Sequence, residues 1–161
     1  MKKISGKIYR KGDLLLIGYR FDPIGWLIQK VTKSKFNHVA WILNQTQILE
    51  SGRYGVRINP INKYSNKFFY RHTIIRITNI SKKKIDKALR IALVSTKRGN
   101  YLKQLWTFVL LIFKYEGILP RPTCSGLIAQ ALHKVGFKFK TKRASRITPE
   151  DMYESKYTRP I

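Results

Sequence analysis

Short apolar runs bounded by turn residues fill the first half of the chain and predict β-strands. Four consecutive aliphatic residues lie between Gly12-Asp13 and Gly18, a pattern typical of a buried strand. Four more runs of strand length follow, at His38–Leu43, Gln47–Glu50, Gly55–Asn59 and His72–Ile77. Because these runs are separated by short polar segments, they predict a meander of antiparallel strands.

The second half of the chain has the three-and-four spacing of helices. The apolar stripe that follows Ser81 consists of Ile85, Ala88, Leu89 and Ala92. Ser81 fits an N-cap, and this helix is expected to end near Lys97. Further helices are expected at about 23–31 and 101–115, and from Cys124 onward. The segment Thr148-Pro149-Glu150-Asp151 fits a helix start, with a threonine cap, proline at the first position and acidic residues in the first turn.

Composition makes this a folded, strongly basic protein. The 161 residues suit a single domain, 1–161, and 43% of them are hydrophobic, which is too many for a disordered basic tail. There are 33 Lys and Arg against 8 Asp and Glu, a net charge of +25. Such a surface attracts an anionic polymer or surface, whether cell-wall polymer, lipid head groups or nucleic acid. The basic loop Lys138–Arg146 is the first candidate for that contact.

The sequence argues against a disulfide-bonded, a metal-binding, a secreted and a membrane-spanning protein. The chain has one cysteine, so it has no internal disulfide, and it lacks the Cys and His spacing of a zinc site; we expect no metal and no cofactor. The basic start lacks the apolar core of a secretory signal, which predicts cytoplasmic synthesis of a viral or intracellular bacterial protein, or of one delivered to the cell envelope. The apolar segment 105–113 is too short to span a bilayer. The oligomeric state is left open.

The single cysteine lies where a thiol can be activated. Cys124 follows a proline-bounded loop and begins an apolar-periodic helix, and the positive end of a helix favours a thiolate. His38 begins a predicted strand far upstream and can supply the base that such a thiol needs. His72, in another predicted strand, is a rival base without a neighbouring carboxylate, and His133 lies too far along the Cys124 helix to reach the thiol.

Glu50 is the natural third member, because a histidine base needs a polar group to fix its orientation. It is the only acidic residue between Asp22 and Asp86. If the hairpin loop has three residues, Asn44 to Thr46, then Ala40 pairs with Glu50, and the side chains of His38 and Glu50 share one face as diagonal neighbours. A loop of two or four residues would place them on opposite faces.

Two further residues are candidates for binding the oxyanion or the substrate. The N–H groups of Ser125 and its neighbours at the helix start are suitably placed donors, and Tyr101 could add a hydroxyl group. The ordinary alternatives are a core cysteine, a half-buried sheet histidine and a solvated glutamate at a strand end. The combination of the three residues favours chemistry over these alternatives.

The ordered set of motifs resembles a known family of cysteine hydrolases. Cys124-Ser125-Gly126-Leu127 at a helix start is similar to the nucleophile motif of NlpC-type cell-wall peptidases. The histidine precedes the cysteine here, as in the circularly permuted, YiiX-like branch, whose wider relatives include lecithin–retinol acyltransferases. The resemblance implies an α+β, papain-like fold with an antiparallel sheet or small barrel packed against helices. It also implies a nucleophile at a helix N-terminus, with Cys124, His38 and Glu50 as the catalytic residues. The long apolar insertion between Tyr101 and Cys124 departs from the family's compact pattern.

Three functions follow as hypotheses. The first is a thiol hydrolase that cleaves an amide bond, with a peptide bond of bacterial peptidoglycan as the substrate. The second acts on a lipid acyl ester or thioester, as a hydrolase or acyltransferase of the same fold. The third is a non-catalytic basic protein that binds nucleic acid or membrane, where neutralised phosphates alone give affinity.

Overall fold

One antiparallel sheet organises the molecule. The structure is a computed structural model that describes residues 8–21, 23, 26, 29, 30, 34–52, 55–94, 123–139 and 144–161. The strands are β1 (Leu14–Tyr19), β2 (His38–Ile42), β3 (Gln47–Gly52), β4 (Gly55–Pro60), β5 (Tyr70–Ile77) and β6 (Thr158–Pro160). They form a six-stranded sheet in the order β4-β3-β2-β1-β5-β6, which makes the fold α+β.

The strand order corrects the predicted simple meander. Strands β1 to β4 follow one another as neighbours, but β5 pairs with β1 instead of β4. The reason lies in β1, whose residues Leu14–Ile17 are completely buried. A strand covered on both faces belongs in the middle of a sheet, with a hydrogen-bonded neighbour on each side. Strand β6, too short for a pattern, was not predicted. In the described part of the chain β4 and β6 are the two edges, so the sheet is open and the alternative of a small barrel is not formed.

The β2–β3 hairpin has the predicted register. Ala40 pairs with Glu50, and the N–H of Leu43 donates to the carbonyl oxygen of Gln47 at 3.0 Å. The intervening loop is held by Asn44, whose Oδ1 accepts hydrogen bonds from the backbone N–H groups of Thr46 and Gln47. An asparagine that bonds the backbone ahead of it stabilises such a turn. The prediction of an odd-numbered loop is therefore confirmed.

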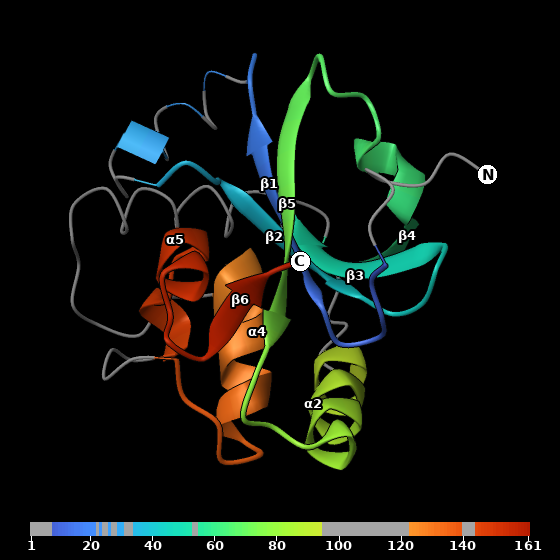
Figure 1. Cartoon of the computed structure of the whole chain (residues 1–161), viewed down its shortest axis with the longest axis vertical. Coiled ribbons are helices and arrows are strands. Elements are labelled where there is room, and N and C mark those ends of the chain that lie inside the picture. Colours follow the sequence, from blue (N-terminus) through green and yellow to red (C-terminus); the bar gives the residue numbers. More distant parts are fainter. Residues whose placement is uncertain are drawn as a thin grey trace.

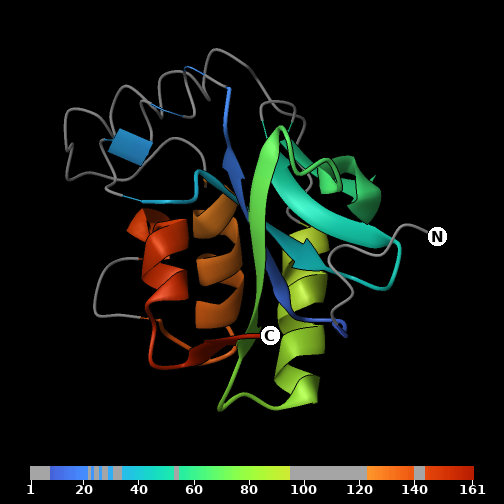
Figure 2. The same cartoon turned by 45° about the horizontal axis from the view of Figure 1, so that its top comes forward.

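The helices gather on one face of the sheet (Figures 1 and 2). They are α2 (Lys82–Val94), α4 (Cys124–His133) and α5 (Pro149–Tyr153), with the short 3-10 helix η2 (Ala144–Arg146). Their apolar side chains pack against Leu14, Leu16, Val39 and Trp41. The opposite face carries a second core around Leu15, Ile17 and Ile48, which is closed by Tyr9 and by the 3-10 helix η1 (Ile61–Tyr64). The sheet is thus buried on both sides.

Two predicted helix starts are confirmed. At α2, the hydroxyl oxygen of Ser81 accepts a hydrogen bond from the N–H of Lys84 at 3.4 Å, and Ala88, Leu89 and Ala92 are buried as the stripe predicted. At α5, Thr148 and Asp151 form a reciprocal capping box with proline in the first turn. Such caps satisfy N–H groups that the first turn of a helix cannot bond internally.

Several predictions fall wholly or partly outside the described residues. Of the helix expected at 23–31, the structure describes residues 23, 26, 29 and 30, all helical. The end of α2 beyond residue 94, the helix 101–115 with its apolar segment 105–113, and residues 140–143 of the basic loop lie outside. No helix among the described residues is long and apolar enough to cross a membrane.

A close backbone approach explains the glycine near the end of β1. A methyl group at Gly18 would lie 2.7 Å from the carbonyl oxygen of Lys35, in the segment that leads into His38. We expect Gly18→Ala to lower the free energy of unfolding by about 1–3 kcal/mol, because overpacking forces the backbone to shift. Gly52→Ala is the control, since among the described residues, its chain neighbours aside, no atom lies within 4 Å of the added carbon. Thermal unfolding followed by circular dichroism compares them, and equal midpoints would contradict this account.

Candidate active site

Strand ends and a helix start bring the three predicted residues together. His38 is the first residue of β2, Glu50 lies in β3, and Cys124 is the first residue of α4. The Nε2 atom of His38 lies 2.7 Å from Oε2 of Glu50, and the thiol of Cys124 is hydrogen-bonded to the same imidazole. Because Glu50 occupies Nε2, the bond to the thiol falls to Nδ1. The imidazole therefore bridges a sulfur and a carboxylate.

The start of α4 surrounds the thiol with donors. Thr123 caps the helix, and its Oγ1 accepts a hydrogen bond from the N–H of Gly126 at 3.0 Å. The backbone N–H groups of Ser125 and Val39 bond to the Cys124 sulfur. Two N–H donors and the positive end of a helix all favour negative charge on the sulfur. The starts of α4 and β2 thus together stabilise negative charge on the Cys124 sulfur.

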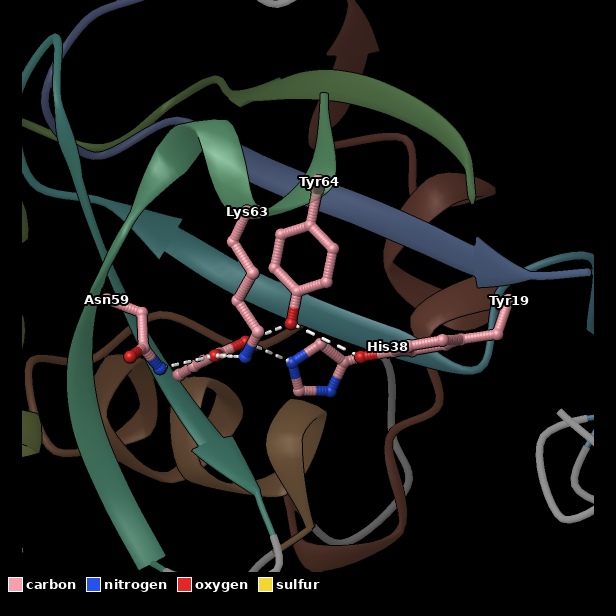
Figure 3. A network of polar contacts seen from close by, with 6 residues as sticks. Tyr19, His38, Asn59, Lys63 and Tyr64 are labelled. Atoms are coloured by element: carbon pink, nitrogen blue, oxygen red, sulfur yellow. Dashed lines mark hydrogen bonds and ion pairs between the residues drawn. The ribbon is translucent and has the colours of Figure 1, made fainter. Parts of the chain in front are cut away.

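Glu50 is the centre of a buried polar network, shown in Figure 3. Its Oε2 accepts a hydrogen bond from the hydroxyl of Tyr64 at 2.5 Å, in addition to the contact with His38. Its Oε1 accepts from Nδ2 of Asn59 and Nζ of Lys63, each at 2.6 Å. The hydroxyl of Tyr64 lies 3.2 Å from that of Tyr19. The glutamate side chain is 5% exposed, so its negative charge is satisfied by protein donors.

Sequence reasoning missed Asn59, Lys63, Tyr64 and Tyr19. Asn59 of β4 pairs with Ile48 of β3. Because Ile48 and Glu50 lie on the same face of β3, continuing the alternation of side chains into β4 would have placed Asn59 on that face as well. Lys63 and Tyr64 lie in the 3-10 helix η1, which has no periodic pattern. A turn of four residues leaves no sequence signal for the direction of its side chains.

The neighbouring charges reverse the effect of burial on His38 and Cys124. Burial alone would lower the pKa of His38, but the charge and hydrogen bond of Cys124, together with those of Glu50, raise the pKa to about 10. Burial alone would raise the pKa of Cys124, whereas the charge and hydrogen bond of His38 and the two N–H donors lower it below its usual value. An opposite charge within a few ångströms favours both charged forms. Both shifts favour a thiolate on Cys124 beside an imidazolium on His38.

The same balance keeps Glu50 ionised and its tyrosine neighbours neutral. Burial would raise the pKa of Glu50, but His38, Lys63 and Tyr64 hold it well below the usual range. Burial and the charge of Glu50 raise the pKa of Tyr64 far above its ordinary value. For Tyr19, burial is the largest cause, and the pKa rises to about 12. Tyr64 therefore donates a hydrogen bond to a fixed negative charge, and the neutral Tyr19 contacts the Tyr64 hydroxyl.

The remaining candidate residues have different positions. The side chain of Ser125 is buried, and its hydroxyl lies 3.4 Å from that of Thr123, so only its N–H faces the thiol. Tyr101 lies outside the described residues. His72 pairs with Ile17 on the far side of β1 from His38, about 10 Å away across two strand spacings. His133 ends α4, nine residues after the cysteine.

The donor set at the site can do nucleophilic chemistry but is poor for a metal. No group of three or more His, Cys, Asp or Glu side chains within the described ranges could hold a metal ion, whereas zinc sites commonly take three or four such ligands. A thiolate held beside an oriented imidazolium is the arrangement that attacks carbonyl carbons. This arrangement can support nucleophilic attack by the Cys124 sulfur, with the imidazole of His38 as the acid–base group.

Comparison of the whole fold gives a distant structural likeness. No protein-family model and no curated protein sequence matches the chain. Among solved structures, the chain is similar to the metalloprotein YiiX from Escherichia coli O157:H7, with a TM-score of 0.67 and 12% sequence identity. The match covers 94% of this chain and 96% of the YiiX chain. At this identity the likeness establishes a shared fold, which agrees with the YiiX-like architecture that the motifs implied.

Proposed function

We propose that the protein is a cysteine hydrolase with a Cys124–His38–Glu50 triad. The observation that supports this most is the imidazole of His38, which bonds the Cys124 thiol on one side and the buried carboxylate of Glu50 on the other. A structural cysteine does not need a pKa lowered by an imidazolium and two N–H donors. The likeness to the YiiX fold supports the circularly permuted, papain-like arrangement that the motif order suggested.

The chemistry would run in two steps. The thiolate of Cys124 attacks the carbonyl carbon of an amide or ester, and the C–S bond forms as the carbonyl oxygen becomes an oxyanion. The backbone N–H groups at the start of α4, those of Cys124 and Ser125, are the candidate oxyanion donors. The His38 imidazolium gives its proton to the leaving amine or alkoxide as the bond to the carbonyl breaks. Neutral His38 then takes a proton from water, which attacks the thioester, releases the carboxylic acid and restores the Cys124 thiolate and the His38 imidazolium.

Glu50 would orient the base without exchanging the proton. Its low pKa and its donors Asn59, Lys63 and Tyr64 keep it ionised through both steps. A fixed carboxylate at Nε2 holds the imidazole ring in one orientation, with Nδ1 toward the sulfur. The three donors are therefore positioning residues that act through Glu50.

The proposed substrate is an amide in bacterial peptidoglycan, on the strength of the nucleophile motif. The acyl ester or thioester of a lipid is the second candidate, favoured by exposed aromatic residues described below. YiiX carries the description of a metalloprotein, but the described residues here offer no three-ligand group and both His38 nitrogens are engaged. The proposal therefore contains no metal step.

A trapped acyl-enzyme tests the proposal. We expect rapid acid quenching during turnover to give an acyl adduct on Cys124, detected by intact-mass and peptide mass spectrometry. The substrates to compare are soluble peptidoglycan fragments, p-nitrophenyl acyl esters and phospholipid vesicles. Cys124→Ser, which preserves the size of the side chain, should form no adduct and lose hydrolysis. Unchanged hydrolysis by this variant would refute the mechanism, and slow thiol labelling insensitive to His38 would favour the non-catalytic basic binder.

A further inference from the structure

Three phenylalanines form an exposed cluster at the end of β1 and the start of β5. Phe21 and Phe68 are each 65% exposed and Phe69 is 48% exposed. The rings of Phe21 and Phe68 stack with centroids 5.2 Å apart, and Phe69 meets both rings edge-on, at 6.2 Å and 5.2 Å. We call these three residues the aromatic patch. A contiguous apolar cluster that remains in water commonly marks an interaction surface.

The aromatic patch is continuous with the candidate active site. The ring of Phe69 lies 6.4 Å from that of Tyr70, and Tyr70 lies 5.3 Å from Tyr19 across paired strands. Tyr19 in turn lies 6.3 Å from the His38 ring. An unbroken row of rings therefore leads from the surface to the imidazole, and the patch sits at the same end of the sheet as the reactive groups.

Basic side chains flank the aromatic patch. Arg20 and Lys67 are adjacent in sequence to Phe21 and Phe68, Arg71 lies two residues after Phe69, and all three basic residues are exposed. In the segments 17–23 and 65–73 the only acidic residue is Asp22. Aromatic side chains surrounded by lysine and arginine are typical of proteins that bind the surface of anionic membranes, where rings enter the acyl boundary and cations meet phosphates.

We propose that the aromatic patch and its basic flank dock the protein on an anionic lipid bilayer. The three rings contact one another and remain largely exposed, so they present a compact apolar surface that can enter the acyl boundary as a unit. Single-stranded nucleic acid is bound instead by aromatic side chains spaced along a basic groove, on which successive bases stack. The net charge of +25 adds a long-range attraction to the same surface.

Docking in this way would bring the candidate active site to the bilayer. The row of rings places His38 near the membrane plane, so the carbonyl that Cys124 attacks would be presented at or beside the lipid surface. This orientation rests on the proposed hydrolase function, whereas the docking itself does not. Membrane docking and hydrolysis by Cys124 can therefore be tested, and refuted, independently of each other.

Vesicle flotation tests the docking. We expect the full chain to float with phosphatidylcholine vesicles that contain about 30% phosphatidylglycerol, whose negative surface attracts basic side chains. Partitioning to pure phosphatidylcholine vesicles should be at least about tenfold weaker. The double variant Phe21→Ser with Phe68→Ser should lose at least about tenfold in affinity, since it removes the apolar surface that would be buried in the bilayer. Ile58→Ser, at a side chain 50% exposed on β4, is the control and should bind as the original chain does.

Two further sets of variants separate the effect of the local basic charge, and that of the thiol, on vesicle binding. Lys67→Glu with Arg71→Glu should weaken binding to anionic vesicles more than Lys83→Glu with Lys87→Glu, which makes the same change of net charge on α2. Cys124→Ser should float normally, because docking does not depend on the thiol. Equal binding to both vesicle types, or full binding by the phenylalanine double variant, would overturn the proposal. So would a single-stranded oligonucleotide that binds more tightly than vesicles and loses affinity in that variant.

Discussion

Replacing His38 with alanine should raise the pH at which Cys124 reacts with iodoacetamide. In the original chain the His38 charge and hydrogen bond lower the pKa of the thiol below its usual value, so the midpoint should lie below that of an ordinary thiol. Without the imidazolium, burial remains and the midpoint of the pH profile should move to about 8.5 or above, the value of an ordinary thiol. At that value only about 3% of the thiol is ionised at pH 7. Alkylation rates measured by mass spectrometry from pH 4 to 11 give the midpoint.

The midpoint is the informative quantity, because a thiolate of low pKa is intrinsically a weaker nucleophile and its plateau rate is reduced. A second rise near pH 10 is expected in the original chain only, where His38 loses its proton and the freed thiolate becomes more reactive. His133→Ala, on the same helix, and His72→Ala, on β5, are the matched controls and should leave the profile unchanged. A profile that shifts with His72 and not with His38 would assign the base to the rival histidine.

Removing the carboxylate of Glu50 should have the largest effect on stability. Glu50→Ala leaves His38, Asn59, Lys63 and Tyr64 without their common acceptor, and breaking a buried charge pair costs about 3–5 kcal/mol. For a chain of this length the thermal midpoint should fall by about 6–20 °C. Calorimetry and urea unfolding measure the two quantities.

Smaller changes keep this prediction testable if Glu50→Ala does not fold. Tyr64→Phe deletes one hydroxyl donor to the carboxylate and should cost about 1–3 kcal/mol. Tyr70→Phe retains the ring and removes a hydroxyl that makes no hydrogen bond to a described residue, so it should be nearly neutral. If the two tyrosine variants unfold at the same urea concentration, the network around Glu50 does not stabilise the fold as described.

The pH dependence of this contribution has a definite sign. The folded pKa of Glu50 is lowered, so its stabilisation is present above the unfolded value of about 4.3 and is lost as the pH falls below it. The folded pKa of His38 is raised to about 10, so its stabilisation is complete below about 6.5 and is lost as the pH rises toward 10. The difference in unfolding free energy between the original chain and Glu50→Gln should therefore be widest between about pH 4.5 and 6.5.

The sequence by itself determined the local elements and one decisive register. Apolar runs located five of the six strands, and the stripe and caps located the starts of α2 and α5. The loop Asn44–Thr46 fixed Ala40 opposite Glu50, because alternation along paired strands leaves only two faces to choose from. Those features depend on residues close together in the chain, which is why they could be predicted.

Only the tertiary structure decided which distant elements meet. No pattern in β5 encodes that it pairs with β1, and nothing in η1 indicates that Lys63 and Tyr64 turn toward Glu50. The ionisation of Cys124 and His38 depends on burial and on charges contributed by β2, β3 and α4 together. Electrostatic interactions of this kind act through space at short range, so they exist only once the sheet and the helix have packed.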